Sequence, residues 1–198
     1  MNLAARHWLS SILLAVLALL PSSASAGMTP EEVKEFEGYK AKAEKGDANA
    51  QCILGYCYDS GIGVAKDEVE AVKWYRKAAD QGNAQAQSNL GGCYAIGRGV
   101  AKDEVEAVKW YRKAAEQGFA LAQFNLGNCY ANGRGVAKDE IEAYAYYNLA
   151  GTTDEDARKN RTLLENKMSR DEIAAAQKRT KELQKEIESK IAASKAGK

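Results

Sequence analysis

Four cysteines are the side chains in this sequence with the widest range of possible chemistry, and three of them recur at one interval. Cys57, Cys93 and Cys129 lie 36 residues apart, whereas Cys52 stands outside that series. Neighbouring thiols could ligate zinc or exchange disulfides, but the sequence contains no C-x-x-C pair. We predict that the three recurring thiols are buried and unbridged. Cys52 cannot readily reach Cys57 along one helix, so we predict that it is also unbridged, and we interpret it as an exposed thiol.

Residues 1–26 have the pattern of a secretory signal peptide. Arg6 supplies a positive start, residues 9–20 form an apolar segment, and residues 24–26 are Ala-Ser-Ala, a cleavage motif. A membrane anchor needs about 20 apolar residues, and this segment is shorter. We predict cleavage before Gly27, a periplasmic or secreted mature protein, and no membrane insertion after cleavage.

The predicted mature chain has no histidine, because the only one, His7, lies in the signal peptide. Imidazole is the usual general base near neutral pH and the commonest metal ligand, so Ser/His/Asp and Cys/His catalysis and most zinc sites are excluded. Loss of Arg6 from the 28 basic residues leaves 27, which equals the 27 acidic ones. This balance argues against nucleic acid as a partner, since neutralising phosphates needs a basic surface. We predict no catalytic residue, metal site or cofactor.

Glycine triplets and carboxylate pairs could suggest phosphate binding or acid/base catalysis. The triplet Gly97-Arg98-Gly99 has counterparts 36 residues before and after it, but none has the lysine and hydroxyl of a phosphate loop. Asp and Glu open the helix that follows each triplet, and they would repel phosphate. We interpret the triplets as turns with positive φ, and pairs such as Asp103 with Glu106 as helix caps.

A repeat of helix pairs positions all these residues. The stretch VAKDEVEAVKWYRKAA occurs at residues 64–79 and again at 100–115, and other columns keep the same period of 36: Gly46, Gly82 and Gly118; Leu54, Leu90 and Leu126; Tyr58, Tyr94 and Tyr130. In each unit, A-x-A-Q-x-x-L-G-x-C-Y has helical apolar spacing, a glycine turn follows, and an Asp-capped second helix ends the unit. Gly55, Gly91 and Gly127 fall mid-helix, where glycine costs about 1 kcal/mol relative to alanine, so we predict close approach of the paired helix. Such units bury their apolar faces only against neighbours, which predicts an all-α solenoid.

The repeat resembles the Sel-1-like repeat family, a relative of the tetratricopeptide repeats. Residues 48–82 and 84–118 follow A-x-A-Q-x-x-L-G-x-x-Y-x-x-G-x-G-V-x-x-D-x-x-x-A-x-x-W-Y-x-K-A-A-x-Q-G nearly throughout, and residues 120–150 follow it with a divergent second helix. The resemblance implies a right-handed superhelix whose first helices line a concave face, and an adaptor that holds another protein. A cysteine-rich branch of the family includes penicillin-binding or β-lactamase-like members. Ala78 and Gln87 stand at places where that branch has bridging cysteines, so its activity is not implied.

The predicted organisation has helical caps at both ends. It comprises a signal peptide at 1–26, an N-terminal capping helix at 27–46, repeats at 47–82, 83–118 and 119–151, and a C-terminal helical cap at 152–198 with a flexible basic end. The N-terminal cap is expected to be a degenerate second helix, because Val33, Phe36 and Tyr39 match apolar positions of that helix.

The C-terminal cap is predicted from the outward side of the third repeat. Lysines of the earlier repeats are replaced there by Ala145 and Leu149, and an apolar end of a solenoid needs a cover. The last helix opens with Ser169 and Glu172, a capping box, and has an apolar seam formed by Ile173, Ala176, Thr180, Leu183 and Ile187. Two heptads are short for a coiled coil, so packing within one chain, and a monomer, is favoured over a dimer through this seam.

Positions that differ between the copies are not fixed by packing, so they are free to contact a ligand. In the first helices these positions fall on one face. They are Asn49, Cys52, Ile53, Tyr56 and Ser60 in the first copy, Gln85, Ser88, Asn89, Gly92 and Ile96 in the second, and Leu121, Phe124, Asn125, Asn128 and Asn132 in the third. Aromatic anchors among amides suit recognition of a peptide or loop. We predict an exported, non-catalytic adaptor that binds an unidentified protein or peptide on this face. An unselected surface, an envelope hydrolase of the cysteine-rich branch, and a structural subunit that dimerises through its last helix stay as alternatives.

Overall fold

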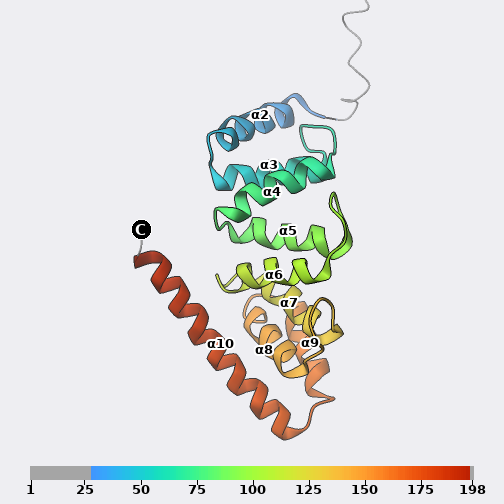
Figure 1. Ribbon diagram of the computed structural model, residues 1–198, viewed down its shortest axis with the longest axis vertical. Helices are drawn as coiled ribbons and strands as arrows, with labels where there is room; N and C mark the ends of the chain where they lie inside the picture. Colours follow the sequence, from blue (N-terminus) through green and yellow to red (C-terminus); the bar gives the residue numbers. More distant parts are fainter. Residues whose placement is uncertain (1–27, 197–198) are drawn as a thin grey trace, which may run out of the picture.

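The computed structural model describes residues 28–196, and every regular element in that span is a helix. The predicted signal peptide lies outside the described residues. The helices are α2 Pro30–Glu44, α3 Ala48–Ser60, α4 Glu68–Asp80, α5 Ala84–Ile96, α6 Glu104–Ala115, α7 Ala120–Asn132, α8 Glu140–Ala150, α9 Glu155–Glu165 and α10 Arg170–Ala196. They form one stack from α2 to α9, with α10 running obliquely beside it (Figure 1). Within this span, no helix combines the length and the apolar character needed to cross a membrane.

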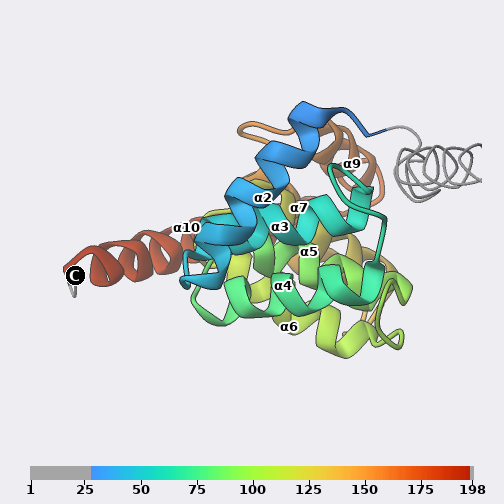
Figure 2. The same cartoon turned by 90° about the horizontal axis from the view of Figure 1, so that it is seen from above.

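The repeats are the pairs α3/α4, α5/α6 and α7/α8, which confirms the predicted solenoid. The first helices α3, α5 and α7 lie on one side of the stack, and α4 and α6 lie on the other (Figure 2). The two helices of a pair approach closely at the mid-helix glycine. A Cβ on Gly55 would lie 2.6 Å from Cδ1 of Tyr75, and a Cβ on Gly91 would lie 2.7 Å from Cδ1 of Tyr111. A tyrosine ring therefore occupies the space that each glycine leaves.

The second helices begin at the predicted aspartates. Asp67 Oδ1 accepts a hydrogen bond from the Glu70 amide at 2.9 Å, and equivalent bonds form in the second and third repeats. The Glu70 carboxylate pairs with Lys73 at 2.8 Å rather than with the amide of Asp67, so only half of the predicted capping box forms. The complete box forms at the start of α10, where the Ser169 amide donates to Glu172 at 2.7 Å and the Glu172 amide donates to the Ser169 hydroxyl at 3.3 Å.

Buried glutamines join each repeat to the preceding second helix. Gln51 Nε2 donates to the Ala43 carbonyl of α2 at 3.0 Å, and Gln87 Nε2 donates to the Ala79 carbonyl of α4 at 3.0 Å. These carbonyls lie in the last turns of their helices, and each also accepts a hydrogen bond from a backbone amide at 3.0 Å, that of Gly46 or Gly82. Gln81 Nε2 then donates to Gln51 Oε1 at 2.6 Å. The recurring glutamine thus adds a buried hydrogen bond between each repeat and the helix that precedes it.

The glycine turns also contact the preceding second helix. A Cβ on Gly99 would lie 2.0 Å from the backbone oxygen of Glu68, and Gly135 has the same relation to Glu104. Gly63 approaches α2 in the same way, because its Cβ would lie 2.3 Å from the Glu32 backbone oxygen. Helix α2 thus contacts the first repeat through Gly63 and through Gln51, as a second helix contacts the repeat that follows it. It is equivalent to a second helix, as the sequence predicted.

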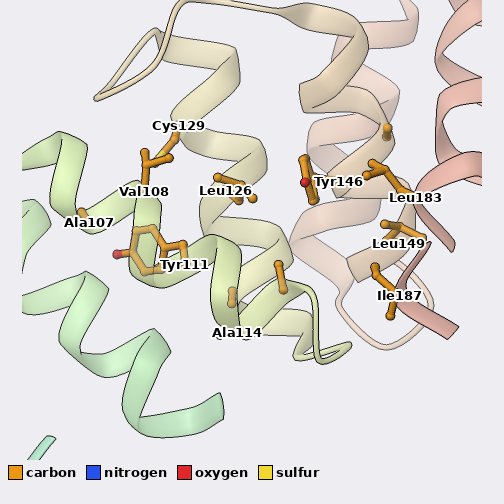
Figure 3. Packing of buried hydrophobic residues seen from close by; sticks show 13 residues of the cluster. Ala107, Val108, Tyr111, Ala114, Leu126, Cys129, Tyr146, Leu149, Leu183 and Ile187 are labelled. Atoms are coloured by element: carbon orange, nitrogen blue, oxygen red, sulfur yellow. The ribbon is translucent and has the colours of Figure 1, made fainter. Parts of the chain in front are cut away.

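The C-terminal helix folds back over α8, as predicted. Leu183 and Ile187 of α10 are buried beside Leu149 of α8 in one apolar cluster (Figure 3). Arg179 of α10 pairs with Glu142 of α8, with 2.6 Å between Nε and Oε1. The seam that could have paired two chains is therefore buried within one chain.

Candidate functional site

The first helices form a groove on one side of the stack. We define the first-helix groove by Tyr56 of α3, Asn89 and Ile96 of α5, and Leu121, Asn125 and Asn128 of α7. It contains a central hollow of about 310 Å³ and a second hollow of about 200 Å³. Ile96, Tyr111 and Asn125 line both hollows, so the two are adjacent.

Large apolar side chains are exposed along this groove. Tyr56 is 52% exposed, Ile96 is 62% exposed and Leu121 is 47% exposed. Asn89 and Asn125 are half-buried in the wall of the central hollow. Apolar groups thus stand next to amides that can donate and accept hydrogen bonds, a combination that suits a peptide with its polar backbone.

The structure corrects two of the predicted site residues. Cys52 and Ser88 are only 4% and 3% exposed, although both were expected on the open face, and Cys52 was expected to be an exposed thiol. Each lies three residues after the first variable residue of its helix, Asn49 or Gln85. Cys52 packs in a cluster with Leu90 and Cys93 of the second repeat.

Two predicted residues of the third repeat contact the end of the stack. The Phe124 ring lies 5.9 Å from the Tyr147 ring, between centroids. Asn128 Oδ1 accepts a hydrogen bond from the Tyr147 hydroxyl at 2.7 Å, and Asn160 of α9 lies 3.4 Å from the same oxygen. Both side chains therefore stabilise the third repeat as well as lining its face.

The remaining predicted residues spread along the first helices outside the two hollows. Asn49, Ser60 and Asn132 are exposed, whereas Ile53 is partly buried against the core of the first repeat. Asn49 Oδ1 accepts a hydrogen bond from Asn83 at 2.8 Å, so it joins two repeats. The structure brings together the middle of the predicted face rather than its whole length.

Sequence reasoning missed an ion pair in the central hollow. Arg98 Nη1 lies 2.9 Å from Asp59 Oδ2, and both side chains line the hollow. Asp59 is replaced by alanine at the same place in the other two repeats, as Ala95 and Ala131. That difference between copies was the available signal, but it lies one residue outside the stripe that the helical spacing selected.

The thiols are buried and free, and no group of three or more His, Cys, Asp or Glu side chains in residues 28–196 is arranged to hold a metal ion. Burial raises the pKa of Cys52, Cys93 and Cys129 to about 11. Thiolates are the nucleophilic and metal-binding form. These cysteines therefore carry little reactivity near neutral pH.

We expect all four thiols to resist 5,5′-dithiobis(2-nitrobenzoate) at pH 8 in the folded chain and to react in guanidinium chloride. An unfolded thiol has a pKa of about 8.5, below the folded value of about 11. As the pH rises, the thiols of the unfolded state lose their protons first. The contribution of the buried thiols to the free energy of unfolding is therefore fully present below about pH 8.5 and decreases as the pH rises toward 11. Fewer than four thiols in denaturant would instead reveal bridging, and rapid reaction of the folded chain would contradict the burial.

A larger hollow of about 440 Å³ lies between α10 and the turn after α6. Three of its charged groups already have partners within the chain, since Lys190 lies 2.9 Å from Glu116 and Lys113 stands over the Trp110 ring. The first-helix groove, which keeps exposed apolar groups beside amides, is the stronger candidate.

Stacked helix pairs closed by terminal helices, with a groove along one set of helices, define a helical repeat scaffold. The Sel1 repeat model matches residues 48–83, 84–119 and 120–152, and the chain belongs to the Sel1 repeat family. Sel1 repeat proteins are in general non-catalytic scaffolds for protein interaction.

Two solved structures have the same fold. A Sel1 repeat protein from Oxalobacter formigenes is 41% identical, with a TM-score of 0.61 over 65% of this chain and 54% of that one. The c5321 protein, a protective antigen present in uropathogenic Escherichia coli strains and displaying an SLR fold, is 32% identical, with a TM-score of 0.59 over 84% of this chain and 44% of that one. This chain thus spans about half the length of both. No curated protein matches it.

Proposed function

We propose that this chain is an exported, non-catalytic adaptor that binds a protein or peptide through the first-helix groove. The observation that carries the proposal is the exposure of Tyr56, Ile96 and Leu121 beside asparagines over two adjacent hollows. Exposed apolar side chains gathered on one face of a soluble repeat are typical of an interaction surface. Export rests on the sequence of residues 1–26, which lie outside the described residues.

A random dodecapeptide library displayed on phage and selected on the mature chain tests the groove. We expect enriched peptides to bind the double variant Ile96→Ser/Leu121→Ser at least about tenfold more weakly, because burying one such side chain contributes about 1.5–3 kcal/mol. Fluorescence polarisation of the synthetic peptides measures the loss. The thermal midpoint should change little, since surface substitutions usually stay within about 0.5 kcal/mol.

The matched control is Val69→Ser/Val105→Ser. These valines are 55% and 54% exposed on the second helices α4 and α6, outside the groove. The control should leave peptide binding unchanged. Equal losses in both double variants, or unchanged binding in the groove variant, would argue that peptides bind elsewhere.

A further inference from the structure

The glycine turns after α5 and α7 each carry an arginine at the same place. Arg98 and Arg134 lie 36 residues apart, and the glycine before each has φ of +75° or +66° and ψ of 36°. The backbone amide of Arg98 donates to the Cys93 carbonyl at 2.9 Å. That of Arg134 donates to the Cys129 carbonyl at the same distance. The backbone therefore holds both arginines in equivalent positions.

The two arginines differ in their partners. Arg98 Nη1 lies 2.9 Å from Asp59 Oδ2, which belongs to the first helix of the preceding repeat. For Arg134 the corresponding residue is Ala95 of α5, which has no carboxylate. Arg134 is exposed and forms no ion pair within residues 28–196. The third repeat thus keeps the arginine, whereas the aspartate that would neutralise it is missing.

Hydrogen-bond donors surround the place of the missing carboxylate. The second hollow, of about 200 Å³, is lined among others by Ala95, Asn125, Asn128 and Arg134. Asn128 Oδ1 accepts from the Tyr147 hydroxyl at 2.7 Å, which leaves the Asn128 amino group as a donor. Asn125 is half-buried in the wall and carries a second carboxamide. A guanidinium and two carboxamides therefore border one hollow.

The remaining polar groups of this hollow leave its charge positive. Glu104 carries the only negative charge among the residues that line it, and this carboxylate is paired with Lys102 at 2.8 Å. Burial raises the pKa of Cys129 to about 11 and also raises the pKa of Tyr111, so both groups are uncharged near neutral pH. The charge of Arg134 is therefore the one left without an opposite charge.

The boundary between the first and second repeats shows that the neighbouring glutamate does not keep a carboxylate away. Glu68 corresponds to Glu104 and is paired with Lys66 at 2.8 Å. The hydrogen bond from Lys66 and, to a smaller extent, the charge of Arg98 lower the pKa of Glu68, so this glutamate lies near the arginine. Asp59 nevertheless pairs with Arg98. A carboxylate beside Arg134 would meet the same surroundings.

We propose that the second hollow binds the side-chain carboxylate of an Asp or Glu residue from the partner peptide. The carboxylate pairs with Arg134, as Asp59 pairs with Arg98. It also accepts hydrogen bonds from the carboxamides of Asn125 and Asn128. Hydrogen bonds between charged groups are stronger than neutral ones. This inference rests on the proposed function and specifies its ligand chemistry.

Other side chains fit this hollow less well. A Lys or Arg side chain would face the positive charge of Arg134. An Asn or Gln side chain accepts hydrogen bonds but does not neutralise the guanidinium. An aliphatic side chain would remove water from the guanidinium without replacing its hydrogen bonds, which costs free energy.

The peptides enriched in the phage selection test this inference. We expect them to share an Asp or Glu at one position. Synthetic peptides with that residue changed to Asn or Gln should bind at least about tenfold more weakly, because hydrogen bonds between charged groups are lost. All synthetic peptides carry an amidated C-terminus, so the chain end supplies no carboxylate. The difference should shrink in about 0.5 M NaCl, since salt screens exposed charges.

A variant that supplies the carboxylate from within gives a second arm. Ala95→Asp places an aspartate beside Arg134, as Asp59 stands beside Arg98, and should weaken binding of the acidic peptide at least about tenfold. Binding of the Asn or Gln version should change much less. Gly38→Asp is the charge-matched control, since Gly38 lies in α2 with nothing within 4 Å of a Cβ. This control should bind the acidic peptide normally.

Arg134→Gln tests the same contact without adding a group to a helix. Arg134 lies exposed in a turn, so the thermal midpoint should change little. Binding of the acidic peptide should fall at least about tenfold, and combining this variant with the Asn or Gln peptide should cause little further loss, as a double-mutant cycle measures. Arg134→Glu should in turn favour a peptide with Lys at that position.

The possible failures are distinguishable. If no peptide is enriched, or if Ile96→Ser/Leu121→Ser binds normally, the proposed function itself fails. If peptides require Ile96 and Leu121 but tolerate Asn or Gln in place of every acidic residue, only the carboxylate inference is overturned. Normal binding of the acidic peptide by Arg134→Gln, or by folded Ala95→Asp, would overturn it as well.

Discussion

Replacing Gly99 with alanine is expected to destabilise the chain by about 3–5 kcal/mol and to lower its thermal midpoint by on the order of 10 °C. Two costs combine at this position. Gly99 has φ of +64°, a conformation that alanine adopts only with strain. Its new Cβ would also lie 2.0 Å from the backbone oxygen of Glu68, which cannot move without displacing the start of α4.

Gly82→Ala separates these two costs. Gly82 has φ of +87°, but nothing lies within 4 Å of its Cβ position. This variant should lose only the conformational part, about 1–2 kcal/mol. Urea denaturation followed by circular dichroism measures both. If both variants lost the same free energy of unfolding, the close contact between the Gly99 turn and α4 would be contradicted.

Truncating the buried side chains of α10 is expected to release that helix from α8. Leu183 and Ile187 are each 5% exposed, and Leu→Ala or Ile→Ala in a core costs about 2–5 kcal/mol. Leu183→Ala/Ile187→Ala together should therefore cost about 4 kcal/mol or more, limited by what α10 contributes in total. The ion pair of Arg179 with Glu142 is partly exposed and is too weak to hold the helix alone.

Hydrogen exchange followed by mass spectrometry localises the effect. Amides of α10 should exchange rapidly in the double variant, whereas those of α3 to α6 should keep their protection, because stability in a repeat array is local. Leu163→Ala is the control, since Leu163 is 59% exposed on α9. Persistent protection of α10 would show that other contacts hold it in place.

Much of this fold could be predicted because the same pattern of apolar residues, glycines and helix caps occurs three times in the sequence. Recurrence at 36 residues marked the helix pairs, and Gly55, Gly91 and Gly127 indicated close helix approach. The partner of each glycine, a tyrosine ring, was not predictable, because the spacing of residues within one helix does not say which residue of the neighbour faces it. The role of Gln51 was missed for the same reason: its acceptor lies in the preceding unit.

The candidate groove was only partly predictable. A helical period correctly places Tyr56, Asn89 and Asn125 on one face, but it treats each helix as if it stood alone. The packing of one repeat on the next decides which edge of that face is covered, and it buries Cys52 against Leu90 and Cys93. The convergence of Asp59, Arg98 and Tyr111 depends on two helices, α3 and α6, and on the turn after α5, so no local pattern reveals it.

Gly99 and Gly135 make the same turn contact. A Cβ on Gly99 would lie 2.0 Å from the backbone oxygen of Glu68, and a Cβ on Gly135 would lie 2.0 Å from that of Glu104. The second and third units therefore meet the unit before them through the same turn contact. Duplicating 36 codons at the boundary between the first and second units would add a module that fits on both sides, while α10 still closes the far end. Tandem duplication would thus lengthen the first-helix groove by one repeat at a time, with the same contacts between neighbouring repeats.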